Sequence, residues 1–194
     1  MPTIATPTIL RDPGFLFWAP LGSTVPAMTV VGSKFTDVWP VAWIQLGATD
    51  KGSKLKYATK LEAISVAEIF DPIQWATTER TGTVEFALAS YTLANLNRAF
   101  NTGTLTTVSG SGTTLLTKLS PPTPGNELRA MIGFESTDST LRAIAYQTVQ
   151  GGDIEMDFMR APNNTIIPCT FNFEVPSSGN PVDFWAAGVA RTGS

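Results

Sequence analysis

The sequence predicts a mainly β protein: two packed antiparallel β-sheets, as a β-sandwich or partial barrel, flanked by one short α-helix. Short runs rich in β-branched and aromatic residues recur along the chain, and turn-forming residues separate them at intervals of roughly 8–12 residues. Only one stretch has the apolar period of a helix. The 194 residues suffice for one domain, which we expect at 15–175 between arms at 1–14 and 176–194.

The first elements are an arm and two short strands. Pro2, Pro7 and Pro13 favour an extended arm over regular structure, because proline lacks a backbone N–H and fixes φ. Apolar runs rich in aromatic residues then predict strands at about 15–19 and 38–46.

A basic segment follows these strands. We expect a long, flexible hairpin or loop at about 47–60, because Gly52 lies among closely spaced charges. The charges are those of Lys51, Lys54, Lys56 and Lys60. Residues 61–70 are expected to form a strand rather than a helix, because Pro72 ends the run early.

The stretch from residue 80 to residue 101 changes period without a linker. Its first part alternates polar and apolar residues as a strand does, and its second part has apolar residues at helical spacing. We expect a helix at about 90–101, with the Ser90 hydroxyl as its N-cap. We expect the apolar side chains of both parts to form a helix–sheet clamp, made of Val84, Phe86, Leu88, Leu93, Leu96 and Phe100.

The second half of the chain is predicted to be almost entirely β. A hairpin is expected around Ser109–Gly112, and a rigid, proline-rich connector follows it. The remaining strands are expected at about 127–135, 141–148, 153–160, 165–175 and 182–187. We expect the second and third of these to form a meander across Gly151 and Gly152, and Cys169 to be a small core residue.

The composition argues against several functions. The net charge of -3 without a long basic run disfavours tight DNA binding. A single cysteine and no histidine leave no internal disulfide, no Cys/His metal site and none of the usual nucleophile–base pairs, so we expect neither a cofactor nor an enzyme. Apolar runs are too short for a membrane anchor. Charged residues make up 15%, against about 25% in typical domains, which suggests that part of the surface meets protein.

Two other functions start from weaker patterns. Glu155 and Asp157 would lie on one strand face, as the two catalytic carboxylates of a glycosidase might. Ser53 and Lys54 are adjacent in the sequence and could be considered as a Ser-Lys catalytic pair. We expect solvated surface in both cases. The five tryptophans, as part of a sugar-binding face, would favour a carbohydrate- or surface-binding module, although each lies in an apolar run that suits a core or subunit interface better. They are Trp18, Trp39, Trp43, Trp75 and Trp185.

Two segments together resemble the major tail tube protein of long-tailed, non-contractile bacteriophages, particularly those of actinobacterial hosts. The first is "GFLFWAPLGSTVP" followed by "FTDVWPVAWIQLGATDKG"; the second is "VAEIFDPIQWATTERTGTVEFALASYTLANLNRAFNTGT". They cover roughly residues 14–103. The run "DVWPVAWIQLG" departs from the family pattern, which leaves open the residues that make ring-to-ring contacts.

The resemblance implies a structural virion protein. Six subunits would close a ring, with one sheet from each forming an inner barrel, and the rings would stack into a tube that conducts DNA into the host. The partners implied are further copies of the chain, tail tip, tape-measure and tail terminator proteins, and passing double-stranded DNA that is not tightly bound. The location implied is the virion tail, with assembly in the host cytoplasm. A related tube of a tailocin or secretion system is the nearest alternative.

Two sets of charged residues receive roles on this interpretation. The tube wall should not attract phosphates, so we expect acidic side chains to face the lumen. The candidates are Glu85, Glu135, Glu155 and Asp157. We expect the loop that carries Lys51, Lys54, Lys56 and Lys60 to reach the neighbouring ring, and the two arms to tie subunits together.

Overall fold

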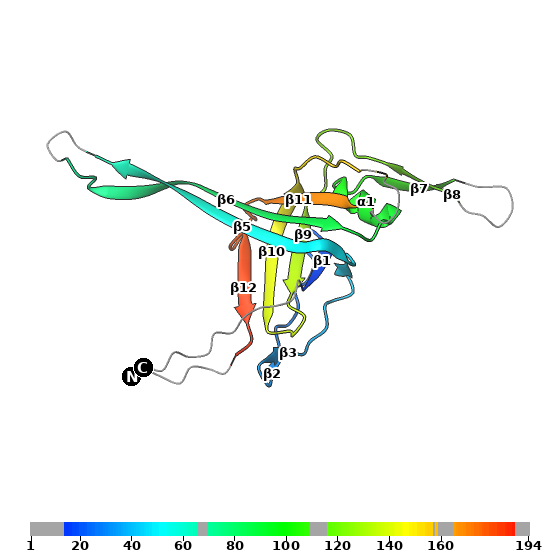
Figure 1. Cartoon of the computed structure of the whole chain (residues 1–194), viewed down its shortest axis with the longest axis horizontal. Coiled ribbons are helices and arrows are strands. Elements are labelled where there is room, and N and C mark those ends of the chain that lie inside the picture. The colour runs from blue at the N-terminus through cyan, green and yellow to red at the C-terminus, as the bar shows by residue number, and fades with distance from the viewer. Residues whose placement is uncertain (1–13, 66–69, 109–115, 157, 159–164, 189–194) are drawn as a thin grey trace.

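The computed structural model describes residues 14–65, 70–108, 116–156, 158 and 165–188 (Figure 1). Its elements confirm a mainly β, antiparallel fold with one short helix. In chain order they are β1 (Phe15–Pro20), β2 (Val30–Val31), β3 (Lys34–Phe35), β4 (Ile44–Gln45), β5 (Thr49–Ile64), β6 (Gln74–Leu88), α1 (Leu93–Ala99), β7 (Thr104–Val108), β8 (Leu116–Ser120), β9 (Ala130–Glu135), β10 (Leu141–Gln150), β11 (Ile167–Phe173) and β12 (Val182–Ala186).

The main sheet has the order β4-β1-β9-β10-β11-β6-β5, and β12 also pairs with β10. Strand β10 is the point at which the sheet bends, because it pairs with β9, β11 and β12. Its residues 141–145 pair with β12 and its residues 148–150 with β11, and its ladder with β9 shifts register between Ala145 and Thr148. A strand that bends in this way lets one sheet fold into two layers that cross steeply. Figure 1 shows the result, with β5, β6 and β11 running across β9, β10 and β12.

Two apolar clusters lie on opposite faces of the β1–β9–β10 layer. The larger cluster is between the layers and includes Phe86, Ile167 and Phe171, with the helix against its side. The smaller cluster lies on the opposite face, where Trp43 packs against Ile144 and the ring of Trp39 stacks on that of Phe17 with centroids 4.2 Å apart. The layer is therefore covered on both faces.

The helix begins later than predicted. Thr92, not Ser90, is the N-cap, and its Oγ1 accepts a hydrogen bond from the Asn95 amide at 3.0 Å. The Ser90 hydroxyl instead accepts a hydrogen bond from the Ala48 amide at 3.2 Å. Both hydroxyls could cap, but Ser90 is used to join the end of β6 to the start of β5.

Three predicted elements are wrong. The loop at 47–60 is mostly strand, because residues 49–64 form β5. Of 38–46, only Ile44–Gln45 is strand, since Trp39 and Trp43 turn into the smaller cluster. At 153–160, the described residues 153–156 and 158 are not strand. No meander forms there, because β10 already pairs with β9 on one edge and with β11 and β12 on the other.

Of the strand expected at 61–70, residues 61–64 are the end of β5, and residues 66–69 lie outside the described residues. The other predicted strands are present with shifted ends. Strands β1, β6, β9, β10 and β11 match the predicted runs, and β7 pairs with β8 as the expected hairpin, whose tip lies outside the described residues. The predicted C-terminal arm is in part sheet, because β12 lies within it. The predicted N-terminal arm lies outside the described residues, except Gly14.

Candidate assembly surface

The most prominent surface feature is a two-stranded ribbon made by β5 and β6. Strand β11 pairs with β6 only from Thr83 to Leu88, so residues 74–82 of β6 pair with β5 alone. Burial changes at the same point, since Gly82 is buried under the Phe173 ring and residues 77–81 are exposed. Figure 1 shows the ribbon extending well beyond the rest of the molecule. A two-stranded ribbon is marginally stable alone in water, so this length suggests a partner.

One face of the ribbon continues the core face of the sheet. Directly opposed residues in an antiparallel pair share a face, and alternate residues along each strand do so too. Ser53 opposes Phe86 and Leu55 opposes Val84, within or beside the main core. The same face continues outward through Tyr57 and the Thr59–Arg80 pair. Beyond a register shift between Lys60 and Leu61, it carries Leu61, opposite Thr77, and Ala63, opposite Trp75.

This outer segment is exposed in the single chain. Leu61 is 51% exposed and Trp75 is 60% exposed, and the neighbouring Ile73 is exposed as well. We call Leu61, Ala63 and Trp75 the outer apolar face. An apolar side of a strand pair that runs past the end of its own core is the pattern of an interaction surface.

The opposite face of the ribbon is charged. Lys54 opposes Glu85, with Nζ and Oε2 3.6 Å apart, and Lys60 opposes Glu79. Lys60 also forms an ion pair of 3.2 Å with Glu62, and Lys56 lies on this face opposite Thr83. Exposed pairs of this kind contribute about 0–1 kcal/mol each, so their role is solubility and orientation more than stability.

The structure therefore brings together two sets that were assigned to different surfaces. Glu85, predicted to face a lumen, shares a face with Lys54 and Lys56, predicted to contact a neighbouring ring. Lys51 lies at the start of β5, with its ammonium 4.0 Å from the Asp50 carboxylate. The basic residues thus stand on a strand and not on a loop, and their alternation with Leu55 and Tyr57 is the signal for it in the sequence.

The other predicted acidic residues are dispersed. Glu155 is exposed in an irregular segment, and Asp157 lies outside the described residues. Glu135 was predicted to face the lumen, but its side chain is buried at the end of β9 and forms an ion pair with Arg142.

The predicted helix–sheet clamp supports the base of the ribbon. Four of its six residues are buried in the larger cluster, namely Val84, Phe86, Leu88 and Leu96, and Leu93 and Phe100 pack against that cluster half-buried. The inner half of β6 is therefore held by apolar packing on one face and by β11 at its edge.

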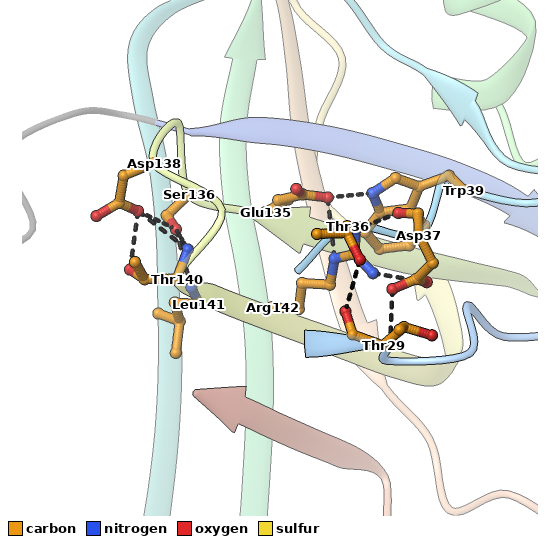
Figure 2. A network of polar contacts seen from close by, with 10 residues as sticks. All are labelled: Thr29, Thr36, Asp37, Trp39, Glu135, Ser136, Asp138, Thr140, Leu141 and Arg142. Carbon is orange, nitrogen blue, oxygen red and sulfur yellow. Dashed lines mark hydrogen bonds and ion pairs between the residues drawn. The ribbon is translucent and has the colours of Figure 1, made fainter. Parts of the chain in front are cut away.

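A buried polar network around Arg142 fixes the connection between β1 and β4 (Figure 2). Arg142 is 1% exposed; its Nε donates to Glu135 at 3.0 Å and its Nη1 donates to Asp37 at 2.9 Å. Its Nη2 donates to the Asp37 carbonyl oxygen at 2.7 Å, and the Trp39 indole donates to Glu135. The guanidinium also lies over the Phe35 ring, 4.7 Å from its centroid.

This network was not predicted. Asp37, Glu135 and Arg142 come from three separate segments, and only the solitary Arg142 inside the apolar run "LRAIAY" gave a sign of it. A charged residue on a strand face that is otherwise apolar must be paired when buried. Its partners could not be read from the sequence.

Acid should weaken this network. Burial alone would raise the pKa of Asp37, but the hydrogen bond and positive charge of Arg142, with backbone hydrogen bonds, outweigh it and lower that pKa from 3.8. A lowered pKa stabilises the fold above the unfolded-state value, and that contribution is lost as pH falls through the folded-state value. We expect the urea midpoint of the native chain to fall more steeply than that of Asp37→Asn between about pH 5 and pH 3. Parallel pH curves would contradict the assignment.

The lone thiol is not available for chemistry. Burial raises the pKa of Cys169 to about 12, so the nucleophilic thiolate is scarce at neutral pH. We expect a maleimide to label Cys169 more than about 100-fold more slowly in the native protein than in urea at pH 7.5. Equal rates would place the thiol at the surface.

The described residues contain no cluster of three or more cysteine, aspartate or glutamate side chains able to hold a metal ion. Within the same part of the chain, no helix has the length and apolar character needed to cross a bilayer. The fold and its surface therefore define a class of protein: a β-sheet protein with a projecting hairpin, the β5–β6 ribbon, that has one apolar and one charged face.

Comparisons with known proteins leave the family open. No protein-family model matches the chain, and no curated protein matches it. Among solved structures, a chain of the six-fold-symmetrised cryo-EM structure of the anti-feeding prophage (AFP) baseplate is similar at 8% identity, with a TM-score of 0.46 over 96% of this chain and 100% of that one.

Proposed function

We propose that this chain is a structural, non-catalytic subunit of a phage tail tube. On this proposal it assembles into hexameric rings, and the rings stack into a conduit through which DNA passes into the host. The partners proposed are further copies of itself and the tail tip, tape-measure and terminator proteins, in a virion tail assembled in the host cytoplasm. The sequence resemblance to tail tube proteins motivates the ring and the tube.

The observation that carries self-assembly is the outer apolar face of the ribbon. Leu61 and Trp75 continue the face that is buried as core nearer the body, yet no part of the described chain covers them. Strand β5 is also an edge of the main sheet, so its backbone N–H and C=O groups are available for pairing. A contact between unlike patches of identical subunits closes into a ring or continues as a stack.

The charged face of the ribbon suits a second role. We propose that the ribbon carrying Lys51, Lys54, Lys56 and Lys60 reaches the neighbouring ring, with its alternating charges giving orientation. Glu155 and Asp157 remain proposed lumen residues. A lumen without excess positive charge would let DNA pass without binding tightly, as the net charge of -3 also favours.

The carbohydrate-binding alternative has less support. It calls for several exposed tryptophans on one face, but Trp18 and Trp43 are buried and Trp39 and Trp185 pack half-buried against the smaller cluster. Among the tryptophans, Trp75 is the exposed one. A tailocin or secretion-system tube would use the same surfaces and is distinguished from a phage tail by the particle that contains the protein.

Negative-stain electron microscopy of the purified chain over a range of concentrations, with its mass in solution, tests the proposal. We expect hollow six-fold rings, or stacked tubes, that increase with concentration. A monomer at every concentration, also in the presence of the tail tip proteins that would start a tube, would overturn self-assembly.

A further inference from the structure

We propose that an apolar cleft between the two layers of the sheet is a docking site for the N-terminal segment of the same chain, residues 4–10. The cleft has a volume of about 200 Å³ and lies between the β5–β6 layer and the strands β9, β10 and β12. Its apolar lining includes Leu16, Leu55, Phe134, Leu141, Val182 and Phe184.

The chemistry of the cleft selects an apolar occupant. Ser53 is the one lining residue with a polar side chain, and Phe184, which is 56% exposed, lies where the cleft meets solvent. A protein cavity of about 150 Å³ lined by similar residues stays dry and binds benzene, so this cleft has room for an aliphatic side chain. Sugars and phosphates would leave their polar groups unpaired there.

The described chain begins at the wall of this cleft. A Cβ on Gly14 would lie 2.5 Å from the Phe134 ring and 2.6 Å from the Glu135 carbonyl oxygen, so only glycine fits against that ring. Gly14 has a φ of 74°, a backbone conformation that glycine adopts at no steric cost. The segment that precedes Gly14 is therefore tethered beside the Phe134 wall of the cleft.

The length and composition of the segment fit this path. Three residues separate Leu10 from Gly14, so their Cα atoms are at most about 14 Å apart when the chain is extended, which suits a site that begins at Phe134. Ile4, Ile9 and Leu10 are its large apolar side chains. A segment tethered this close has an effective concentration near the millimolar range, so docking within one chain is favoured over docking between chains. The contact does not depend on assembly into a tube.

Trypsin provides the test, because Arg11 lies between the docked residues and Gly14. Cleavage after Arg11 requires the segment to leave the cleft. We expect the double variant Ile9→Ser/Leu10→Ser to be cleaved there at least about tenfold faster than the native chain. Phe184→Asp, which makes the cleft mouth polar, should have the same effect, whereas Val41→Asp at a fully exposed site outside the cleft should have none.

The outcomes separate this proposal from its rivals. Native protein that is cleaved as fast as Ile9→Ser/Leu10→Ser would overturn it. Protection that disappears on dilution would place the segment in a neighbouring copy and would also overturn docking within the chain. If Phe184→Asp fails to fold, as circular dichroism would show, the double variant alone decides the result, because its substitutions lie outside the described domain.

Discussion

Replacing the outer apolar face of the ribbon by serine, in the triple variant Leu61→Ser/Ala63→Ser/Trp75→Ser, is expected to abolish assembly at concentrations where the native chain forms rings. Leu61 and Trp75 are about half exposed in the single chain, so covering each would gain about 1–2 kcal/mol, roughly half of full burial. With a small addition from Ala63, the sum is about 2–4 kcal/mol. Each 1.4 kcal/mol is tenfold in affinity, so the concentration needed for assembly should rise at least about 30-fold.

The opposite face of the same ribbon segment supplies the matched control. Glu62→Ser/Gln74→Ser/Ala76→Ser changes as many positions at the same distance from the body, but on the side that shares its face with the lysines. We expect this variant to assemble within about threefold of the native concentration. Sedimentation velocity over a dilution series measures both. Equal effects of the two triples would mean that general ribbon stability, and not an apolar contact, drives assembly.

The contrast between the two faces also explains what the sequence could predict. The spacing of apolar residues was sufficient to predict β6, β11 and the helix, because apolar residues alternate in the two strands and recur at helical spacing in α1. This spacing was insufficient to predict β5, where lysines stand at positions 51, 54, 56 and 60 and Gly52 suggests a loop. That strand is stabilised by its pairing with β6, a contact between residues far apart in sequence, and tertiary context of this kind overrides local propensity.

The corner at β10 shows the same limit. Residues 141–150 were predicted as a strand, but the choice of β9, β11 and β12 as neighbours depends on the bulge between Ala145 and Thr148. The segment at 153–156 keeps a strand-like alternation, with Glu155 exposed and Ile154 and Met156 packed on the core, although both edges of β10 are already paired. The alternation therefore matches the inward and outward side chains there, but the predicted strand does not form.

The largest effect on stability is expected at Arg142. Replacing it by leucine would leave the Asp37 and Glu135 carboxylates close together without their shared cation, and their side chains are only 14% and 11% exposed. Removing one partner of a buried ion pair typically costs about 3–5 kcal/mol, because the remaining charge is desolvated and unpaired. We expect Arg142→Leu to lower the free energy of unfolding by that amount, measured by urea unfolding followed through tryptophan fluorescence.

Two further variants decide whether the unpaired charge is the cause. Arg129→Leu removes a similar bidentate pair, to Glu174, at a site where the arginine is 38% exposed, and its loss should be much smaller because water can replace the partner. Adding Asp37→Asn and Glu135→Gln to Arg142→Leu removes both unpaired charges and should recover part of the stability. Because Arg142 also stacks on Phe35 and anchors the Asp37 carbonyl group, recovery should be incomplete. An Arg142→Leu variant as stable as the native chain would show that water reaches the two carboxylates. The packing of Trp39 and Trp43 in the smaller cluster would then hold the connection between β1 and β4.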